Sequence, residues 1–140
     1  MSTITNKRII VDGFEEGMNR GNLAYFDQHL APSYVNHNMP APAPGPDGFK
    51  MVVQAFMTAF PDFHATVEDT IAEGDRVSTR GYFAGTHLGE FNGIPATGKS
   101  IRVGFIDIWR LENGKAVENW VQLDMLGLMQ QIGVIPAPGA

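Results

Sequence analysis

Two carboxylates and a histidine are the residues of this sequence best suited to proton transfer. Asp124 stands between two apolar runs in the segment ENWVQLDMLGLMQQIG (118–133), Asp107 lies in IDIWRLE, and His37 lies in VNHN. An apolar pocket raises the pKa of a carboxyl because desolvation disfavours the charged form, and a base near neutrality can abstract a proton next to a carbonyl group. Acid and base catalysis by Asp124, Asp107 and His37 is the chemistry that these residues indicate.

Asp124 has an alternative role, because it directly precedes a predicted helix. An Asp at that position is a good N-cap, since its side chain accepts a hydrogen bond from a free backbone N–H group of the first turn. The helix end would lower the pKa of Asp124, whereas an apolar pocket would raise it. The two roles oppose each other, so we expect Asp124 to perform one of them.

Asp107 lies in the middle of a predicted strand, where a carboxylate that faces a core needs a partner or a proton. Pairing with Trp120 or with an arginine would make Asp107 structural. A protonated Asp107 could instead donate a hydrogen bond to an oxygen that gains negative charge. Trp120 and Gln122 would then orient the substrate, and Phe105 and Trp109 would line the same pocket.

His37 and Asn38 come directly before the segment MPAPAPGPDG (39–48), in which every second residue from Pro40 to Pro46 is proline. Prolines favour extended neighbours and remove backbone donors, so we expect a stiff loop that edges the pocket entrance, with His37 and Asn38 at the mouth. The chain has four histidines without metal-ligand spacing and no cysteine, which predicts neither a metal site nor a disulfide.

His87 is a further candidate for substrate binding. A two-residue turn at Gly74 and Asp75 would place His87 opposite Asp62, at the ends of two paired strands. This arrangement favours a structural tie between the strands, and contact of His87 with the substrate is the alternative.

The elements that must position these side chains fall into two groups. Apolar spacing and breakers predict helices over roughly 4–18, 23–30 and 47–60, strands over 63–73, 76–87, 100–112 and 115–124, and a final helix from 125. Turn signals at Gly74-Asp75 and Asn113-Gly114 join the strands into two antiparallel hairpins. Segregated helices and strands predict an α+β fold, a curved antiparallel sheet covered on one face by the N-terminal helices.

The turn at Asn113-Gly114 also predicts the register of the second hairpin. If Glu112 faces Lys115, then Asp107 faces Trp120 and Phe105 faces Gln122, and alternation places Asp124 on the same face. The opposite face then carries Gly104, Ile106, Ile108, Val117, Val121 and Leu123. Both faces are substantially apolar, so we expect one to enclose a pocket and the other to contact a second subunit in a homodimer.

The composition sets limits on the function. The 140 residues are enough for a single domain over 1–140, and 44% of them are hydrophobic, as in a folded globular protein. A net charge of −5 with scattered Lys and Arg argues against nucleic acid as a partner. The N-terminal segment has no long apolar core, so we expect neither a signal peptide nor a membrane anchor, and a cytoplasmic location.

Several motifs, taken together, resemble the SnoaL-like polyketide cyclases. They are YVNHN, FPDFHATVEDTIAEGDRV, GTHLGEFNGIPATGKSI, IDIWRLENGKAVENW and LDMLGLMQQIGVIP. The resemblance implies the cone-shaped α+β fold of the nuclear-transport-factor-two-like superfamily, with a deep hydrophobic pocket. It also implies an aspartate, here Asp124, that acts as acid and base in an intramolecular aldol closure without a cofactor. Asn119 and Ala96 depart from the family pattern.

The leading hypothesis is therefore an enzyme, a lyase or isomerase that enolises a small hydrophobic carbonyl compound without any cofactor. A ketosteroid isomerase-like enzyme and an epoxide hydrolase, which needs an Asp–Arg–Asp group, are alternatives on the same fold. A non-catalytic protein that binds a small hydrophobic ligand is another alternative. An exposed Asp124 with an ordinary environment would favour the binding protein.

Overall fold

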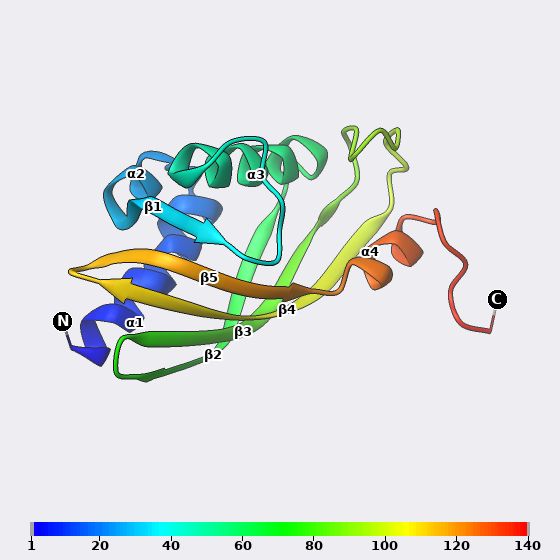
Figure 1. Ribbon diagram of the computed structural model, residues 1–140. Helices are drawn as coiled ribbons and strands as arrows, with labels where there is room; N and C mark the ends of the chain where they lie inside the picture. The colour runs from blue at the N-terminus through cyan, green and yellow to red at the C-terminus, as the bar shows by residue number, and fades with distance from the viewer. Residues whose placement is uncertain (1, 140) are drawn as a thin grey trace.

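The computed structural model describes residues 2–139 and contains a five-stranded sheet with helices against it (Figure 1). The helices are α1 (Thr3–Asp12), its π-helical continuation η1 (Gly13–Asn19), α2 (Ala24–His29), α3 (Gly45–Ala59) and α4 (Met125–Gln131). The strands are β1 (Leu30–Asn36), β2 (His64–Glu73), β3 (Arg76–Thr86), β4 (Ser100–Glu112) and β5 (Lys115–Leu123). The predicted α+β class is confirmed.

The strands lie in the order β1-β5-β4-β3-β2. The two predicted hairpins, β2–β3 and β4–β5, are present and pair with each other through β3 and β4. β1 was not predicted, and it runs parallel to β5 at the edge of the sheet. The sheet is therefore mixed rather than wholly antiparallel, and β1 adds its inward side chains to the same interior.

The N-terminal helices and α3 cover one face of the sheet, called here the inner face (Figure 1). Ile10 and Phe14 of the first helical segment and Val53 of α3 pack against Phe105 and Trp109 of β4. A second cluster closes the other end of the sheet, where α4 contributes Leu128 next to Phe60, Ile101 and Val103. The burial of apolar side chains between these layers is the main force that holds helices and sheet together.

A β-bulge in β5 changes the register predicted for the second hairpin. Glu112 faces Lys115 as expected, but the pairing shifts between Arg110 and Leu111, where the bulge makes Val117 the extra residue of β5. Beyond it, Trp109 faces Asn119, Asp107 faces Val121 and Phe105 faces Leu123. Because side chains alternate, Asn119, Val121 and Leu123 point to the inner face, and Trp120 and Gln122 point to the outer face. The prediction that Trp120, Gln122 and Asp124 share a face with Asp107 is therefore wrong.

A second bulge, between Val67 and Asp69 of β2, shifts the first hairpin in the same way. Asp62 consequently meets Thr86 rather than His87, and its two carboxylate oxygens accept hydrogen bonds from Thr86 N (2.6 Å) and Thr86 Oγ1 (2.7 Å). These bonds lower the pKa of Asp62. The predicted tie between the strand ends exists, with a different partner.

Two neighbouring glycines of the sheet, Gly81 and Gly104, offer a matched test of how closely the strands approach each other at the β2 bulge. A Cβ on Gly81 would lie 1.9 Å from the carbonyl oxygen of Thr66 beside the β2 bulge, whereas a Cβ on Gly104 would lie 3.9 Å from its nearest neighbour. We expect Gly81→Ala to lower the free energy of unfolding by about 2 kcal/mol or more, because the backbone must move. Gly104→Ala should cost nothing measurable. Urea denaturation of both variants checks this, and equal stabilities would contradict it.

Candidate functional site

A small cavity of about 60 Å³ lies between the inner face of the sheet and the helices. Aromatic and aliphatic side chains form most of its wall, and the polar residues that reach it are Asn36, Asp107 and Asn119. The apolar lining is Phe14, Met18, Met39, Phe49, Val52, Val53, Phe56, Phe63, Phe83, Phe105, Trp109, Val121 and Leu123. A mostly apolar pocket with a few convergent polar groups is the usual form of a small-molecule site.

Strand pairing brings the polar groups of the cavity into one band across the sheet. Asn36 of β1 is paired with Asn119 of β5, and Asn119 in turn with Trp109 of β4. Asp107, two residues before Trp109, is paired with Thr79 of β3. Four strands thus bring polar side chains that are far apart in the sequence close together on the inner face, and those of Asn36, Asp107 and Asn119 reach the cavity.

Asp107 is the buried ionisable group of this band, with 4% of its surface exposed. One oxygen of its carboxyl, Oδ1, accepts hydrogen bonds from Thr79 N (3.0 Å) and Thr79 Oγ1 (2.5 Å). Burial raises the pKa of Asp107 from 3.8 to about 6, although the Thr79 bonds and the nearby Trp109 N–H act in the opposite direction. A carboxyl with a pKa near 6 can both take up and release a proton close to neutral pH.

A larger cleft of about 570 Å³ adjoins this inner cavity. The two share Met39, Val52, Phe56, Val121 and Leu123 as walls. Pro40 and Pro42 line the cleft, so the proline-rich loop borders it, and the expectation that the loop edges the pocket entrance stays a prediction. Asn38 also lines it, and its Oδ1 accepts a hydrogen bond from Val121 N (3.0 Å), which fastens the start of the loop to β5.

Asp124 lies outside the cavity. It is exposed, and its Oδ1 accepts a hydrogen bond from Gly127 N (2.9 Å), so it is the N-cap of α4. The capping alternative therefore describes its observed position. The β5 bulge is the reason, because it turns the end of the strand by one residue relative to β4.

His37, Trp120 and Gln122 lie on or near the outer face. The His37 ring stacks on Trp120 with centroids 4.9 Å apart, and His37 Nε2 lies 3.2 Å from Glu118 Oε1. Arg110 Nε donates to the other oxygen of Glu118 (2.5 Å) and lowers the pKa of that carboxyl, with a smaller effect from His37. Gln122 is exposed and reaches the rim of the larger cleft. The expectation that His37 and Trp120 join Asp107 in one pocket is wrong.

His87 is completely buried at the base of the loop between β3 and β4, and lines neither the cavity nor the cleft. Its Nδ1 accepts a hydrogen bond from Thr97 N (3.3 Å) and lies 2.9 Å from Thr97 Oγ1. The backbone N–H of His87 donates to Lys99 O (2.9 Å), and its C=O accepts a hydrogen bond from Gly98 N (2.8 Å). His87 thus fixes the two ends of the loop against each other, in agreement with the structural alternative.

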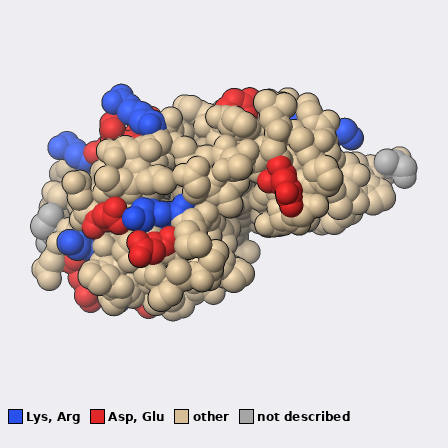
Figure 2. Space-filling model, turned by 90° about the horizontal axis from the view of Figure 1, so that it is seen from above, with Lys and Arg blue, Asp and Glu red and all other residues tan. Residues whose placement is uncertain are grey.

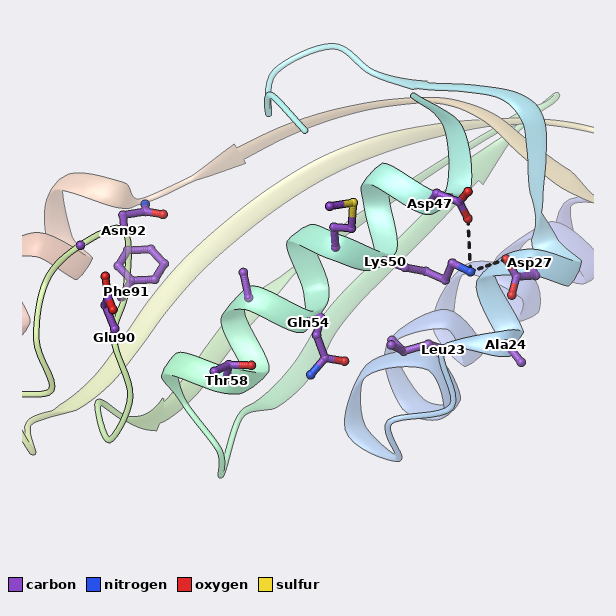
Figure 3. A pocket seen from close by; sticks show the side chains of 13 residues that line it. Leu23, Ala24, Asp27, Asp47, Lys50, Gln54, Thr58, Glu90, Phe91 and Asn92 are labelled. Atoms are coloured by element: carbon purple, nitrogen blue, oxygen red, sulfur yellow. Dashed lines mark ion pairs between the residues drawn. The ribbon is translucent and has the colours of Figure 1, made fainter. Parts of the chain in front are cut away.

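A wider hollow of about 970 Å³ lies on the other side of α3 (Figure 3). Figure 3 shows Lys50 between Asp27 and Asp47, and its Nζ lies 2.7 and 3.4 Å from their carboxylates. None of the charged residues that line it is buried, and Lys50 is already neutralised by its two neighbours. The hollow is larger than the inner cavity, but it brings together no group suited to proton transfer.

Neither a cluster of metal ligands nor a charged patch forms a competing site in the described part of the chain. Residues 2–139 contain no group of three His, Cys, Asp or Glu side chains that could hold a metal ion. On the face shown in Figure 2, Lys and Arg lie beside Asp and Glu, and uncharged residues cover most of the area. None of the helices formed by these residues is long and apolar enough to cross a membrane.

The sequence and fold both match known proteins. The family model of the SnoaL-like polyketide cyclases matches residues 8–132. The chain belongs to this family. TsrD from Streptomyces laurentii has a similar structure, with 29% identity, a TM-score of 0.88 and coverage of 96% of this chain and 99% of TsrD. No curated protein sequence gives a match.

Two further solved structures resemble this SnoaL-like chain. AclR from Streptomyces galilaeus, a proposed hydroxylase, is 28% identical with a TM-score of 0.86, covering 97% of this chain and 85% of AclR. IdmH from Streptomyces antibioticus, a proposed polyketide cyclase, is 31% identical with a TM-score of 0.79, covering 91% and 98%. The fold is thus the cone-shaped one of the nuclear-transport-factor-two-like superfamily, as the motifs implied.

The raised pKa of Asp107 predicts how stability depends on pH. Below pH 3.8 the carboxyl is protonated in both states, and between pH 3.8 and about 6 the folded state holds the proton that the unfolded state has lost. The contribution of Asp107 to the free energy of unfolding should therefore fall by about 3 kcal/mol as pH rises through this window. Asp107→Asn, which stays neutral, should lack this loss and be more stable at pH 7. Urea denaturation at pH 4 and pH 7 checks this, and parallel profiles of the two proteins would contradict it.

Proposed function

We propose that this SnoaL-like protein is a cofactor-independent enzyme that enolises a carbonyl compound, as in an intramolecular aldol closure, with Asp107 as its acid and base. The observation that carries the proposal is the Asp107 carboxyl, buried in the wall of a mostly apolar cavity with its pKa raised to about 6. Membership of the cyclase family supports the reaction class. The proposal replaces Asp124, which the motifs implied, because Asp124 is exposed and caps α4.

The proposed reaction needs one carboxyl in two protonation states. Ionised Asp107 takes a proton from the carbon next to the substrate carbonyl, and the bonding electrons of that C–H bond form the enolate. The enolate carbon attacks a second carbonyl of the same molecule, and the resulting alkoxide takes the proton back from Asp107. The carboxylate is restored and no electrons are gained or lost, so the reaction requires only positioning and one acid-base group.

The two adjoining spaces suit different parts of such a substrate. The inner cavity of about 60 Å³ has room for roughly two groups the size of a water molecule, so it fits the reacting carbonyl end. The cleft of about 570 Å³, with Met39, Met51 and Met125 in its walls, fits the larger apolar remainder. Methionine side chains adapt to ligands of different shape, which suits a flat ring system.

The positions of the same residues also decide between the competing functions. Epoxide hydrolysis by an Asp–Arg–Asp group is disfavoured because no arginine lines the inner cavity in the described chain. The exposed position of Asp124 favours a non-catalytic binding protein, by the criterion that the sequence suggested. Asp107 reverses that balance, because its carboxyl is buried in the wall of the cavity and burial raises its pKa to about 6.

We also propose that a second copy of the chain covers the outer face of the sheet. Ile106 and Ile108 of β4 are 55% and 40% exposed there, next to Gly104 and the half-buried Trp120. A two-fold dimer would remove this apolar strip from water.

The catalytic proposal predicts different results for substitutions of the two aspartates. Asp107→Asn keeps the shape but cannot take up a proton, so deuterium exchange at the central carbon of 1-phenyl-1,3-butanedione should slow by about 10²- to 10⁴-fold, measured by NMR. Asp124→Asn keeps a good N-cap and should leave the exchange rate unchanged. Full activity of the Asp107 variant would refute the assignment.

The dimer proposal predicts that one charge on the outer face dissociates the protein. Ile106→Lys should elute as a monomer in size-exclusion chromatography with light scattering, because the buried ammonium would be desolvated in the interface. Leu88→Lys, at an exposed leucine in the loop after β3, is the matched control and should remain dimeric. A monomeric parent protein would end this proposal.

A further inference from the structure

Thr79 of β3 is a buried polar residue that contacts the Asp107 carboxyl directly. It is 1% exposed, and strand pairing places it opposite Asp107 of β4. Its hydroxyl and its backbone N–H both donate hydrogen bonds to Asp107 Oδ1, at 2.5 and 3.0 Å. Thr79 is not among the residues that line the inner cavity, so it acts on Asp107 from within the sheet rather than from the substrate space.

The two Thr79 bonds make the oxygens of the Asp107 carboxyl unequal. A carboxylate oxygen has two lone pairs, and Thr79 donors occupy both of those on Oδ1. Among residues 2–139, no hydrogen bond of ordinary geometry ends on Oδ2, although the indole N–H of Trp109 is near enough to favour the ionised form. Oδ2 is therefore the oxygen left to take up a proton.

The Thr79 hydroxyl is held in place by its side chain and by its strand. A β-branched side chain has few allowed rotamers at χ1, so the hydroxyl has little freedom to turn away from Asp107. β3 lies between β2 and β4, and Thr79 is paired with Thr70 on one side and with Asp107 on the other. The bond to Oδ1 is thus already ordered before a substrate arrives, which is the condition for a preorganised site.

Little other charge surrounds the Asp107 carboxyl. Asp107 is the only ionisable residue among the described ones that line the inner cavity, and the helices contribute apolar side chains there. The titratable group close to it on another strand is Tyr34 of β1, whose pKa is raised by burial and also by the charge of Asp107. Burial raises the pKa of Asp107, and the Thr79 hydroxyl is the largest of the effects that oppose the rise. Without that hydroxyl, the carboxyl would keep its proton to a higher pH.

We propose that Thr79 is a positioning residue, which holds Oδ1 of Asp107 so that Oδ2 exchanges the proton with the substrate. The inference rests on the proposed function and adds a residue that touches the carboxyl and not the substrate. The proton that leaves the substrate carbon bonds to Oδ2 and later returns from it, while Oδ1 accepts both Thr79 bonds throughout. The hydroxyl also stabilises the charged form, so a larger share of the molecules carries the base near neutral pH.

The pH profile of deuterium exchange tests this role. Thr79→Val keeps the shape and the backbone N–H but removes the hydroxyl, so the midpoint of the exchange rate between pH 4.5 and 7.5 should move upward by about one pH unit. With 1-phenyl-1,3-butanedione as the probe and the uncatalysed rate subtracted, exchange should be about 5-fold slower at pH 6 and less than about 2-fold slower at pH 7.5. Thr79→Ser, which retains a hydroxyl, should have the midpoint of the parent protein.

Ser78 offers a matched control at the neighbouring position. Its Oγ also donates to Asp107, at 2.7 Å, but to the backbone carbonyl oxygen instead of the carboxyl. Ser78→Ala should therefore leave the midpoint unchanged, whatever its melting temperature. A merely structural Thr79 would give a valine variant with a lower melting temperature and the midpoint of the parent protein, and that result would overturn the inference. Should the valine variant not fold, Thr79→Ala and Thr79→Ser differ only in the hydroxyl and make the same comparison.

A direct titration separates this inference from the proposed function. NMR of protein with labelled aspartate carboxyl carbons follows the ionisation of Asp107, whose signal is the one missing from Asp107→Asn. If that titration lies at the same pH in Thr79→Val and in the parent protein, the positioning role is refuted, whatever the exchange rates. If the titration moves upward and the exchange rate does not follow it, Thr79 controls the carboxyl and the catalytic role of Asp107 fails instead.

Discussion

The extra residue at Val117 in β5 decides which side chains of the last strand face the cavity. Before the bulge Glu112 faces Lys115, and beyond it every partner is displaced by one position, so that Asn119 and Val121 point inward. A shift of one residue moves a whole set of side chains to the other face of a strand. The polar band on the inner face exists only because the bulge aligns Asn119 with Asn36 on one side and with Trp109 on the other.

The β5 bulge also places Asp107 and Asp124 in different electrostatic environments. Asp107 is held within the sheet, where burial raises its pKa against the hydrogen bonds that Thr79 supplies. Asp124 lies in solvent at the start of α4, where a backbone N–H binds its carboxylate. A helix N-terminus favours a negative charge, whereas an apolar cavity disfavours it, so one carboxyl could not serve both purposes well. Capping accordingly falls to Asp124, and the acid-base role that we propose falls to Asp107.

The sequence predicted most of the architecture and about half of the site, for reasons that particular residues explain. Helical spacing and the turns at Gly74 and Asn113 located the helices and both hairpins, because these signals are local. The inward positions of Phe105, Asp107 and Trp109 followed from alternation along β4. Neither bulge was predicted, although Ala116 and Val117 are consecutive buried residues, and such a pair interrupts the alternation of a strand.

The remaining part of the site depends on contacts that local patterns do not encode. β1 pairs with a strand more than eighty residues later in the chain, and no turn signal indicates a parallel neighbour. Without β1, Asn36 could not be assigned to the cavity. Asp107 by itself is a buried acid that could equally be a structural residue tied to Thr79. Its place in the wall of a mostly apolar cavity is what favours the proposed acid-base role, because a carboxyl serves proton transfer only where a substrate can reach it.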